Sequence, residues 1–228
     1  MASHPATKLP VYVWDVPVRV WHWVMALCLV VLWATGYLIG SPLPSVGGEA
    51  SDHFLMGYIR FAHFAAGYIF ACVFVFRLYW AIVGNRYARE IFAIPFAALK
   101  PAWWRDYFGV VRYYLFLKRE PGVHVGHNPL AAAAMFGMYV LGSVFMIVTG
   151  FALYGEGLGR ESWAFKAFSS WVIPLFGQSQ DVHTWHHVCA WYLFWFTLVH
   201  LYFVIREDLT SGLTVIGSMV NGWRDRNR

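Results

Sequence analysis

Residues 184–205 read TWHHVCAWYLFWFTLVHLYFVI, and this stretch decides the fold class. It contains no Asp, Glu, Lys or Arg, and it is as long as the run of about 20 apolar residues with which a helix crosses a bilayer. Three further stretches are long and apolar enough to do the same: residues 20–40, 54–83 and 129–154. We therefore predict an all-α integral membrane protein, a four-helix bundle that forms a single domain over residues 1–228.

The composition of the whole chain agrees with a membrane protein. Hydrophobic residues make up 59% of the 228 residues and charged residues only 13%, against about 25% charged in a typical soluble domain. The 13 Trp, 13 Tyr and 19 Phe exclude a disordered chain. The net charge of +5 is spread between apolar stretches, which argues against nucleic acid as a partner. No CxxCH sequence is present, so covalently attached c-type haem is excluded.

Lys and Arg gather on one side of the predicted spans. The N-terminal segment, the 84–128 connection and the C-terminal segment carry most of them: Lys8, Arg19, Arg86, Arg89, Lys100, Arg105, Arg112, Lys118, Arg119, Arg206, Arg224, Arg226 and Arg228. The other side has few basic residues and several acidic ones: Arg60, Arg160, Lys166, Glu49, Asp52, Glu156, Glu161 and Asp181. Since basic loops stay in the cytoplasm, we predict that both termini and residues 84–128 are cytoplasmic and that the loop 155–183 faces outward.

Two connecting segments are rich in aromatic residues. Residues 91–117 mix aromatic and basic side chains, a pattern typical of helices that lie along the membrane surface. We expect one or two interfacial amphipathic helices there, broken near Pro95 and Pro101. We expect the outer loop to contain a second interfacial segment or a docking surface for a partner.

Histidines inside the spans are the candidate functional residues, because an ionisable group in lipid is costly unless it has a role or a partner. His22 and His200 lie near the cytoplasmic ends of the first and fourth spans. His63 and His186 lie in the outer halves of the second and fourth spans. Each histidine taken singly could instead be hydrogen-bonded to a neighbouring helix. The depths nevertheless match in two pairs, which predicts two sites stacked across the membrane.

Helical periodicity selects the histidines of the fourth span. His200 follows His186 by 14 residues, which at about 100° per residue returns to within roughly 40° of the same face, about 21 Å along the axis. His187 points about 140° from His200, and His183 about 100° away. Periodicity therefore favours His186 over these neighbours. We expect His53 and His183 to lie at the outer surface, as solvated histidines or near the place where a partner would dock.

Two imidazoles at each depth are suited to bind haem iron. Zinc fits poorly, since neither depth adds a thiolate or carboxylate to complete four ligands. We therefore predict two haem b groups with His22, His63, His186 and His200 as axial ligands to iron, and no catalytic residue. The candidate partners of the haem propionates are Arg19, Arg60 and Arg77, although Arg77 could instead reach the lipid headgroups. Gly36 and Gly67 would let a porphyrin pack closely, or would serve ordinary helix–helix contact.

Two motifs at opposite ends of the chain resemble a known family. Arg19-Val-Trp-His22-Trp23 with Leu32-Trp-Ala-Thr35-Gly36, and His183-Thr-Trp-His186-His187-Val188 with Trp191, Phe194 and His200, resemble signatures of the b-type cytochrome subunit of membrane-bound nickel–iron hydrogenases. The resemblance implies a multi-pass protein of the bacterial inner membrane in a respiratory chain. It implies as partners the small and large hydrogenase subunits, the small subunit passing electrons through iron–sulfur clusters to the outer haem. It also implies reduction of menaquinone or ubiquinone near the inner haem, with hydrogen activated by the partner.

Two other interpretations stay open on the sequence alone. One is a stand-alone diheme b-type cytochrome that exchanges electrons with quinol without a hydrogenase; the aromatic outer loop and the 84–128 connection favour a docked partner instead. The other is a transporter with a histidine proton relay, which predicts Asp or Glu within the spans. The four predicted spans contain neither residue.

Overall fold

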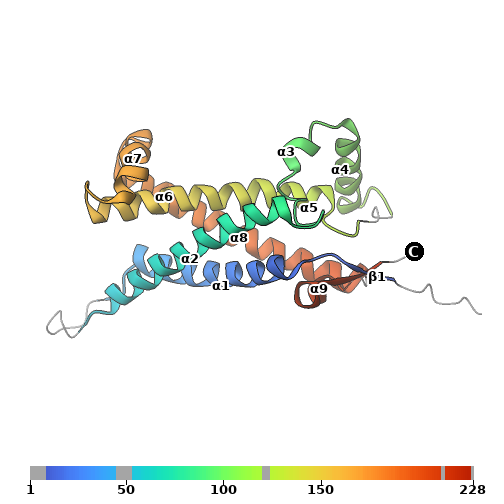
Figure 1. Ribbon diagram of the computed structural model, residues 1–228, viewed down its shortest axis with the longest axis horizontal. Coiled ribbons are helices and arrows are strands. Elements are labelled where there is room, and N and C mark those ends of the chain that lie inside the picture. Colours follow the sequence, from blue (N-terminus) through green and yellow to red (C-terminus); the bar gives the residue numbers. More distant parts are fainter. Residues whose placement is uncertain (1–8, 45–52, 120–123, 212–213, 227–228) are drawn as a thin grey trace, which may run out of the picture. The chain divides into compact units, whose positions relative to one another are not determined.

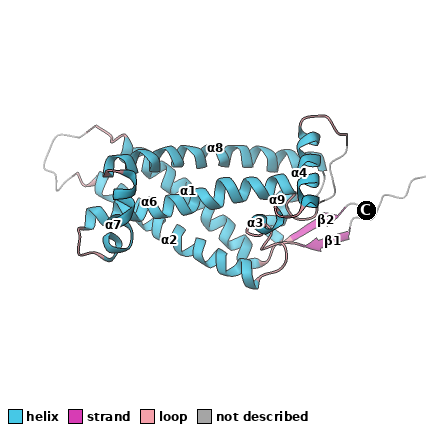
Figure 2. Cartoon of the chain, turned by 90° about the horizontal axis from the view of Figure 1, so that it is seen from above, coloured by secondary structure: helices cyan, strands magenta, loops and turns pink. Residues whose placement is uncertain are grey.

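Helices make up nearly all of the regular structure (Figures 1 and 2). The computed structural model describes residues 9–44, 53–119, 124–211 and 214–226; Lys8, Glu49, Asp52 and Arg228 of the charge count lie outside them. The elements, in chain order, are β1 (Leu9–Tyr12), α1 (Val16–Gly40), α2 (Leu55–Val83), α3 (Ile94–Ala97), α4 (Pro101–Tyr114), α5 (Pro129–Ala134), the π-helix η2 (Met135–Val140), α6 (Leu141–Leu158), the π-helix η3 (Phe165–Ser169), α7 (Ser170–Phe176), α8 (Ser179–Ser211), α9 (Val215–Asn221) and β2 (Trp223–Arg226).

Four helices are long and apolar enough to cross a membrane, which confirms the predicted four spans. They cover Val16–Gly40, Leu55–Val83, Pro129–Leu158 and Ser179–Thr210. Three of them extend beyond the predicted limits, most clearly the fourth, which was expected only over residues 184–205. Hydropathy marks only the part of a helix that lies in lipid, whereas backbone hydrogen bonding continues through the polar residues at its ends.

The third span combines three consecutive elements. Asn128 caps its start, accepting a hydrogen bond from the Ala131 backbone N–H at 2.8 Å, and Pro129 occupies the first turn, where a missing N–H costs nothing. The chain then runs through α5, η2 and α6 to Leu158. A π-helical segment inside an α-helix is a local widening that is common near functional sites.

The connecting segments are partly helical, as their composition predicts. Pro95 and Pro101 each stand in the first turn of a helix, α3 and α4 respectively. This confirms the break expected near these prolines. The outer connection is shorter than the predicted loop 155–183, because α6 continues to Leu158 and α8 begins at Ser179. Between them, η3 and α7 form a helical segment with Pro174 inside α7.

The two ends of the chain pair with each other, which the apolar pattern did not predict. β1 and β2 form an antiparallel sheet in which Tyr12 is opposite Trp223, with ring centroids 5.3 Å apart. Gly222 precedes β2 with φ of 87°, and its carbonyl accepts the backbone N–H groups of Val13 and Trp14 at 2.8 and 3.2 Å. A side chain there would need the rarely occupied left-handed region.

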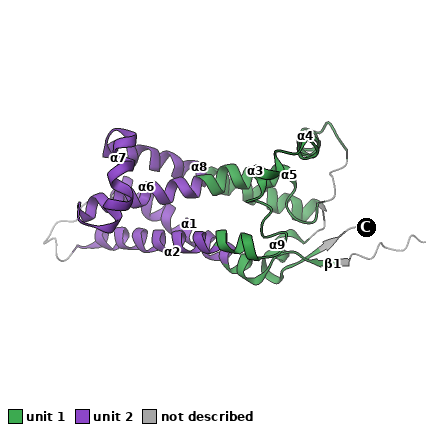
Figure 3. Ribbon diagram, turned by 45° about the horizontal axis from the view of Figure 1, so that its top comes forward, with its two compact units in different colours: residues 1–20, 77–141, 195–228 green, residues 21–76, 142–194 purple. Residues whose placement is uncertain are grey.

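The chain forms two compact units (Figure 3). Unit 1 takes residues 1–20, 77–141 and 195–228, and unit 2 takes residues 21–76 and 142–194. The long helices α1, α2 and α8 contribute residues to both units. That the whole chain acts as a single domain remains a prediction.

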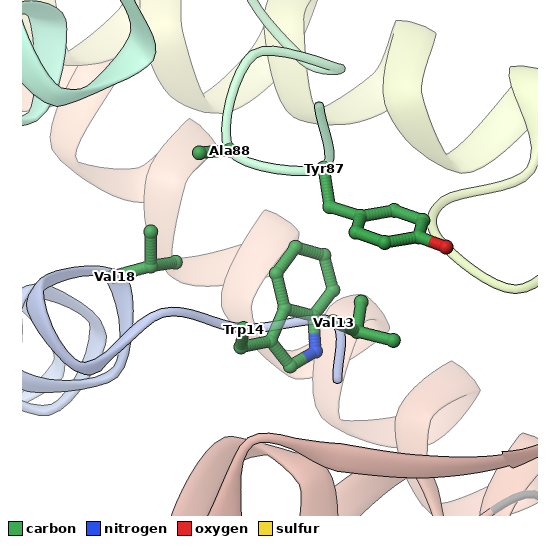
Figure 4. Close-up of a cluster of buried hydrophobic side chains, with 5 residues drawn as sticks. All are labelled: Val13, Trp14, Val18, Tyr87 and Ala88. Atoms are coloured by element: carbon green, nitrogen blue, oxygen red, sulfur yellow. The ribbon is translucent and has the colours of Figure 1, made fainter. Parts of the chain in front are cut away.

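Unit 1 has a small apolar core at the start of α1. Its buried residues are Val13, Trp14, Val18, Tyr87 and Ala88 (Figure 4). Beside this core, the Asp15 carboxylate accepts the side-chain and backbone N–H groups of Asn85 at 2.9 and 3.2 Å. The Asn85 amide also donates to the Val13 carbonyl at 3.0 Å. These bonds fasten the segment before α1 to the segment that follows α2.

Unit 2 contains parts of all four long helices, and aromatic and aliphatic contacts connect them in a closed ring. Helix α1 meets α8, where the Trp33 ring stacks on Phe194 with centroids 4.5 Å apart. Helix α2 meets α6 through Phe64 and Tyr154, 4.9 Å apart. Helix α6 meets α8 where a Cβ at Gly142 would lie 3.0 Å from Leu193. The remaining contact, between α1 and α2, involves a candidate histidine.

Candidate functional site

His63 on α2 faces α1 within unit 2. Its Nδ1 atom is 2.9 Å from the Thr35 hydroxyl oxygen. Its Cε1 atom would be only 3.3 Å from a Cβ on Gly36, the next residue. The imidazole therefore packs against Thr35 and Gly36 of the neighbouring helix. It lies so close to Gly36 that a larger side chain at this position would crowd the ring.

His186 on α8 has the same surroundings, provided by α6. Its Nδ1 atom is 2.7 Å from the Thr149 hydroxyl oxygen, and a Cβ on Gly150 would lie 3.4 Å from its Cε1 atom. The two predicted outer histidines thus contact equivalent Thr–Gly steps on two different helices. His63 and His186 both belong to unit 2. Unit 2 therefore brings together the pair that the sequence places in the outer half of the membrane.

The outer pair fits the requirements of a bis-histidine haem. An iron ligand must present one bare ring nitrogen, while the other usually makes a hydrogen bond that fixes the orientation of the ring. Both rings make their hydrogen bonds through Nδ1, so Nε2 is the nitrogen available to iron. The competing interpretation is that each histidine only satisfies its polar ring atoms by hydrogen bonding to a neighbouring helix.

His187 is the neighbour that helical periodicity disfavours, and the structure gives it different surroundings. It is exposed, and its ring packs against the end of α1, where a Cβ on Gly40 would lie 2.3 Å from its Cε1 atom. His53 and His183 are exposed as well. The ligand assignment of His186 in place of His187 remains a prediction that these contacts support.

The predicted inner pair is divided between the units. His22 belongs to unit 2 and His200 to unit 1, so their pairing remains a prediction. The Nδ1 atom of His22 is buried without a hydrogen-bond partner in the described part of the chain, which is costly unless another group satisfies the ring. The Phe196 ring stacks one helical turn from His200, with centroids 6.0 Å apart.

The three candidate propionate partners have distinct surroundings. Arg19 donates a hydrogen bond to the Val220 carbonyl within unit 1. Arg77, only 2% exposed, donates to the Ala88 carbonyl at 2.5 Å, with its guanidinium carbon 4.9 Å from the centre of the Phe92 ring. Arg60 is exposed on α2. The burial of Arg77 argues against a side chain extended to lipid headgroups, and the role of all three arginines toward haem remains a prediction.

The two candidate packing glycines also differ. Gly36 admits the His63 ring itself, whereas a Cβ on Gly67 would meet Leu32 of α1 at 4.0 Å, an ordinary helix contact. Thr35 appears in the sequence analysis only within a family motif and Thr149 does not appear there, so neither was predicted to contact a histidine. The signal that could have found them is the Thr–Gly dipeptide, which occurs within the first span at Thr35 and within the third at Thr149.

Comparison of the sequence with known proteins identifies the family of this chain. The family described as prokaryotic cytochrome b561 matches residues 13–222. A protein of Azotobacter vinelandii named probable Ni/Fe-hydrogenase B-type cytochrome subunit is 59% identical over 94% of this chain and 88% of its own length. Proteins with corresponding names from Cupriavidus necator and Escherichia coli K12 are 54% and 50% identical, each over 93% of this chain and over 86% and 90% of their own lengths. These matches confirm the resemblance of the first and last spans, and the chain belongs to the prokaryotic cytochrome b561 family.

Proposed function

We propose that this membrane cytochrome carries electrons from the iron–sulfur small subunit of a periplasmic nickel–iron hydrogenase to membrane quinone, through two b-type haems. Membership of the cytochrome b561 family implies b-type haem. The names of the relatives suggest the hydrogenase, and their sequence matches cover nearly the whole of this chain. The observation that carries the proposal is the pair His63 and His186, each with its Nδ1 atom beside a threonine hydroxyl, an arrangement that would leave Nε2 for iron.

His63 and His186 would hold the outer haem, and His22 and His200 the inner one. When bound, haem supplies an iron centre that accepts and releases one electron. The protein's own part is to fix each imidazole before iron binds, which Thr35 and Thr149 do for the outer pair. The second part is to join the helices that carry these histidines, which aromatic ring contacts within unit 2 support.

The stacked sites would move electrons inward across the bilayer. His186 and His200 lie on the one continuous helix α8, about 21 Å apart along its axis at 1.5 Å per residue. Haem edges are closer than haem centres, so an electron can tunnel without movement of the protein. Menaquinone or ubiquinone would then take electrons near the inner haem and protons from the cytoplasm.

The orientation follows from the charge pattern and from the paired ends of the chain. β1 and β2 pair directly, so the segments before α1 and after α9 belong on one side of the membrane. That side carries most of the Lys and Arg, which by the positive-inside rule supports a cytoplasmic location of this side in a bacterium. The outer connection with η3 and α7 would then face the periplasmic hydrogenase.

Purification and turnover test the proposal together. The tagged chain should co-purify with nickel- and iron–sulfur-containing subunits, and the complex should reduce a soluble quinone analogue with hydrogen. A stand-alone quinol cytochrome is the alternative outcome: it would purify alone with its haems and would exchange electrons with quinol only. Purification without b-type absorption bands would contradict both.

A further inference from the structure

We propose that Thr35 and Thr149 are positioning residues that set the tautomer of the two outer histidines and lower the reduction potential of the haem between them. The inference rests on the proposed function, because it takes His63 and His186 as axial ligands. It goes further by assigning a task to two residues outside the ligand set. Neither threonine would touch iron; each acts through an imidazole.

The position of the hydroxyl protons follows from the distances. The Thr35 hydroxyl is 2.6 Å from the Val31 carbonyl oxygen, four residues earlier on α1. The Thr149 hydroxyl is 2.7 Å from the Phe145 carbonyl oxygen on α6. Two oxygens this close require a proton between them, and a carbonyl has none. Each threonine therefore donates its single proton to its own helix, as threonines in helices commonly do.

The tautomer of each histidine follows from that assignment. A hydroxyl that has donated its proton can only accept from a third group. The contacts at 2.9 Å from His63 and 2.7 Å from His186 are therefore Nδ1–H bonds donated to the threonine oxygens. With Nδ1 protonated, the neutral ring has its lone pair on Nε2. Both rings are thereby prepared to bind iron through the same atom.

The glycines complete the arrangement. A Cβ at Gly36 would lie 3.3 Å from Cε1 of His63, closer than comfortable carbon contact, and a Cβ at Gly150 would lie 3.4 Å from Cε1 of His186, at the limit of ordinary contact. Absence of that carbon lets the ring approach the backbone until Nδ1 reaches the hydroxyl of the preceding residue. The same Thr–Gly step occurs at residues 35–36 and 149–150 on different helices, so the two ligands of one haem would receive matching support.

The electronic consequence has a definite sign. An imidazole that donates its Nδ1–H to an oxygen is a more basic ligand, which favours ferric over ferrous iron. Removal of the hydroxyl should therefore raise the ratio of reduced to oxidised haem at a fixed potential. We expect roughly a tenfold change for each threonine, which corresponds to about 59 mV for a one-electron couple.

The test uses the purified full-length protein and potentiometric titration of its haem absorption. Thr35→Val and Thr149→Val keep the branched shape and remove the hydroxyl, whereas Thr35→Ser and Thr149→Ser keep the hydroxyl. Thr210→Val is the matched control, since Thr210 also donates to the carbonyl four residues earlier, at 2.8 Å, and is exposed on α8 away from both histidines. Haem content is measured beside the potential.

We expect each valine variant to keep both haems and to raise one midpoint potential, with the serine variants and Thr210→Val close to the unaltered protein. Loss of one haem in the valine variants, restored by serine, would also support the role of the hydroxyl. Unchanged potentials with both haems bound would overturn the inference, as would equal loss of haem in the valine and serine variants. Failure of the proposed function would give a different result. If His63 is not a haem ligand, His63→Ala would keep both haems.

Discussion

Two glycines one helical turn apart on α1 provide a steric test of which histidine is the ligand. A Cβ at Gly36 would lie 3.3 Å from Cε1 of His63, and a Cβ at Gly40 would lie 2.3 Å from Cε1 of His187. Carbon atoms in contact prefer about 3.5–4.0 Å. Gly36→Ala therefore requires the His63 ring to move by a few tenths of an ångström, and Gly40→Ala requires His187 to move by more than an ångström.

The milder clash should nevertheless have the larger effect on haem. Exposed His187 can rotate away, so Gly40→Ala should leave the spectrum and both potentials unchanged. His63 is held by Thr35, and tight packing of this kind costs about 1–3 kcal/mol. Alanine itself favours a helix over glycine by about 1 kcal/mol, so both variants should fold. Gly36→Ala should then shift the absorption and electron paramagnetic resonance of one haem.

Low-temperature electron paramagnetic resonance of the oxidised protein is the suitable assay, because it resolves the two bis-imidazole irons by ligand orientation. One signal should move in Gly36→Ala while the other stays in place. The opposite result, with Gly40→Ala altering a haem and Gly36→Ala altering none, would refute the reasoning and identify His187 as the ligand.

Three further outcomes follow from the same contacts. His187→Ala should retain both haems by pyridine haemochrome assay; a variant with one haem would show that the wrong neighbour was selected. His200→Ala should lose the inner haem and hydrogen-driven quinone reduction while hydrogen oxidation with an artificial acceptor persists, and joint loss of both activities would contradict the division of labour. Asp15→Ala leaves the Asn85 amide short of an acceptor, at a cost of about 1–3 kcal/mol. It should lower the unfolding temperature in detergent; an unchanged temperature would show that these bonds contribute little.

The four spans could be predicted from the sequence because lipid imposes a minimum apolar length. Their ends could not, since helices such as α8 continue through polar residues on both sides of the apolar run. Pro95 and Pro101 marked the starts of α3 and α4 by local chemistry. The pairing of β1 with β2 joins residues at opposite ends of the chain. A local sequence pattern does not predict such a long-range contact.

The candidate site shows the same division between local and long-range information. Periodicity and depth identified His63 and His186, because both depend only on position within a span. Gly36 was expected to let a porphyrin pack closely or to serve ordinary helix–helix contact; in the structure its missing side chain leaves room for the His63 ring, and its role toward haem remains a prediction. The contacts of the two threonines could not be predicted from the sequence, because a threonine in a helix commonly hydrogen-bonds to the backbone of its own helix. Thr35 and Thr210 both donate to the carbonyl four residues earlier; the contact with His63 and the glycine that follows Thr35 distinguish Thr35.

If four histidines hold two haems at two levels of the membrane, the ratio of haem to protein should change with each of them. This ratio is measured in the purified chain and in His22→Ala, His63→Ala, His186→Ala and His200→Ala. We expect two haems in the unaltered protein and about one in each variant. A single haem in the unaltered protein, or two retained in any of these variants, would contradict it.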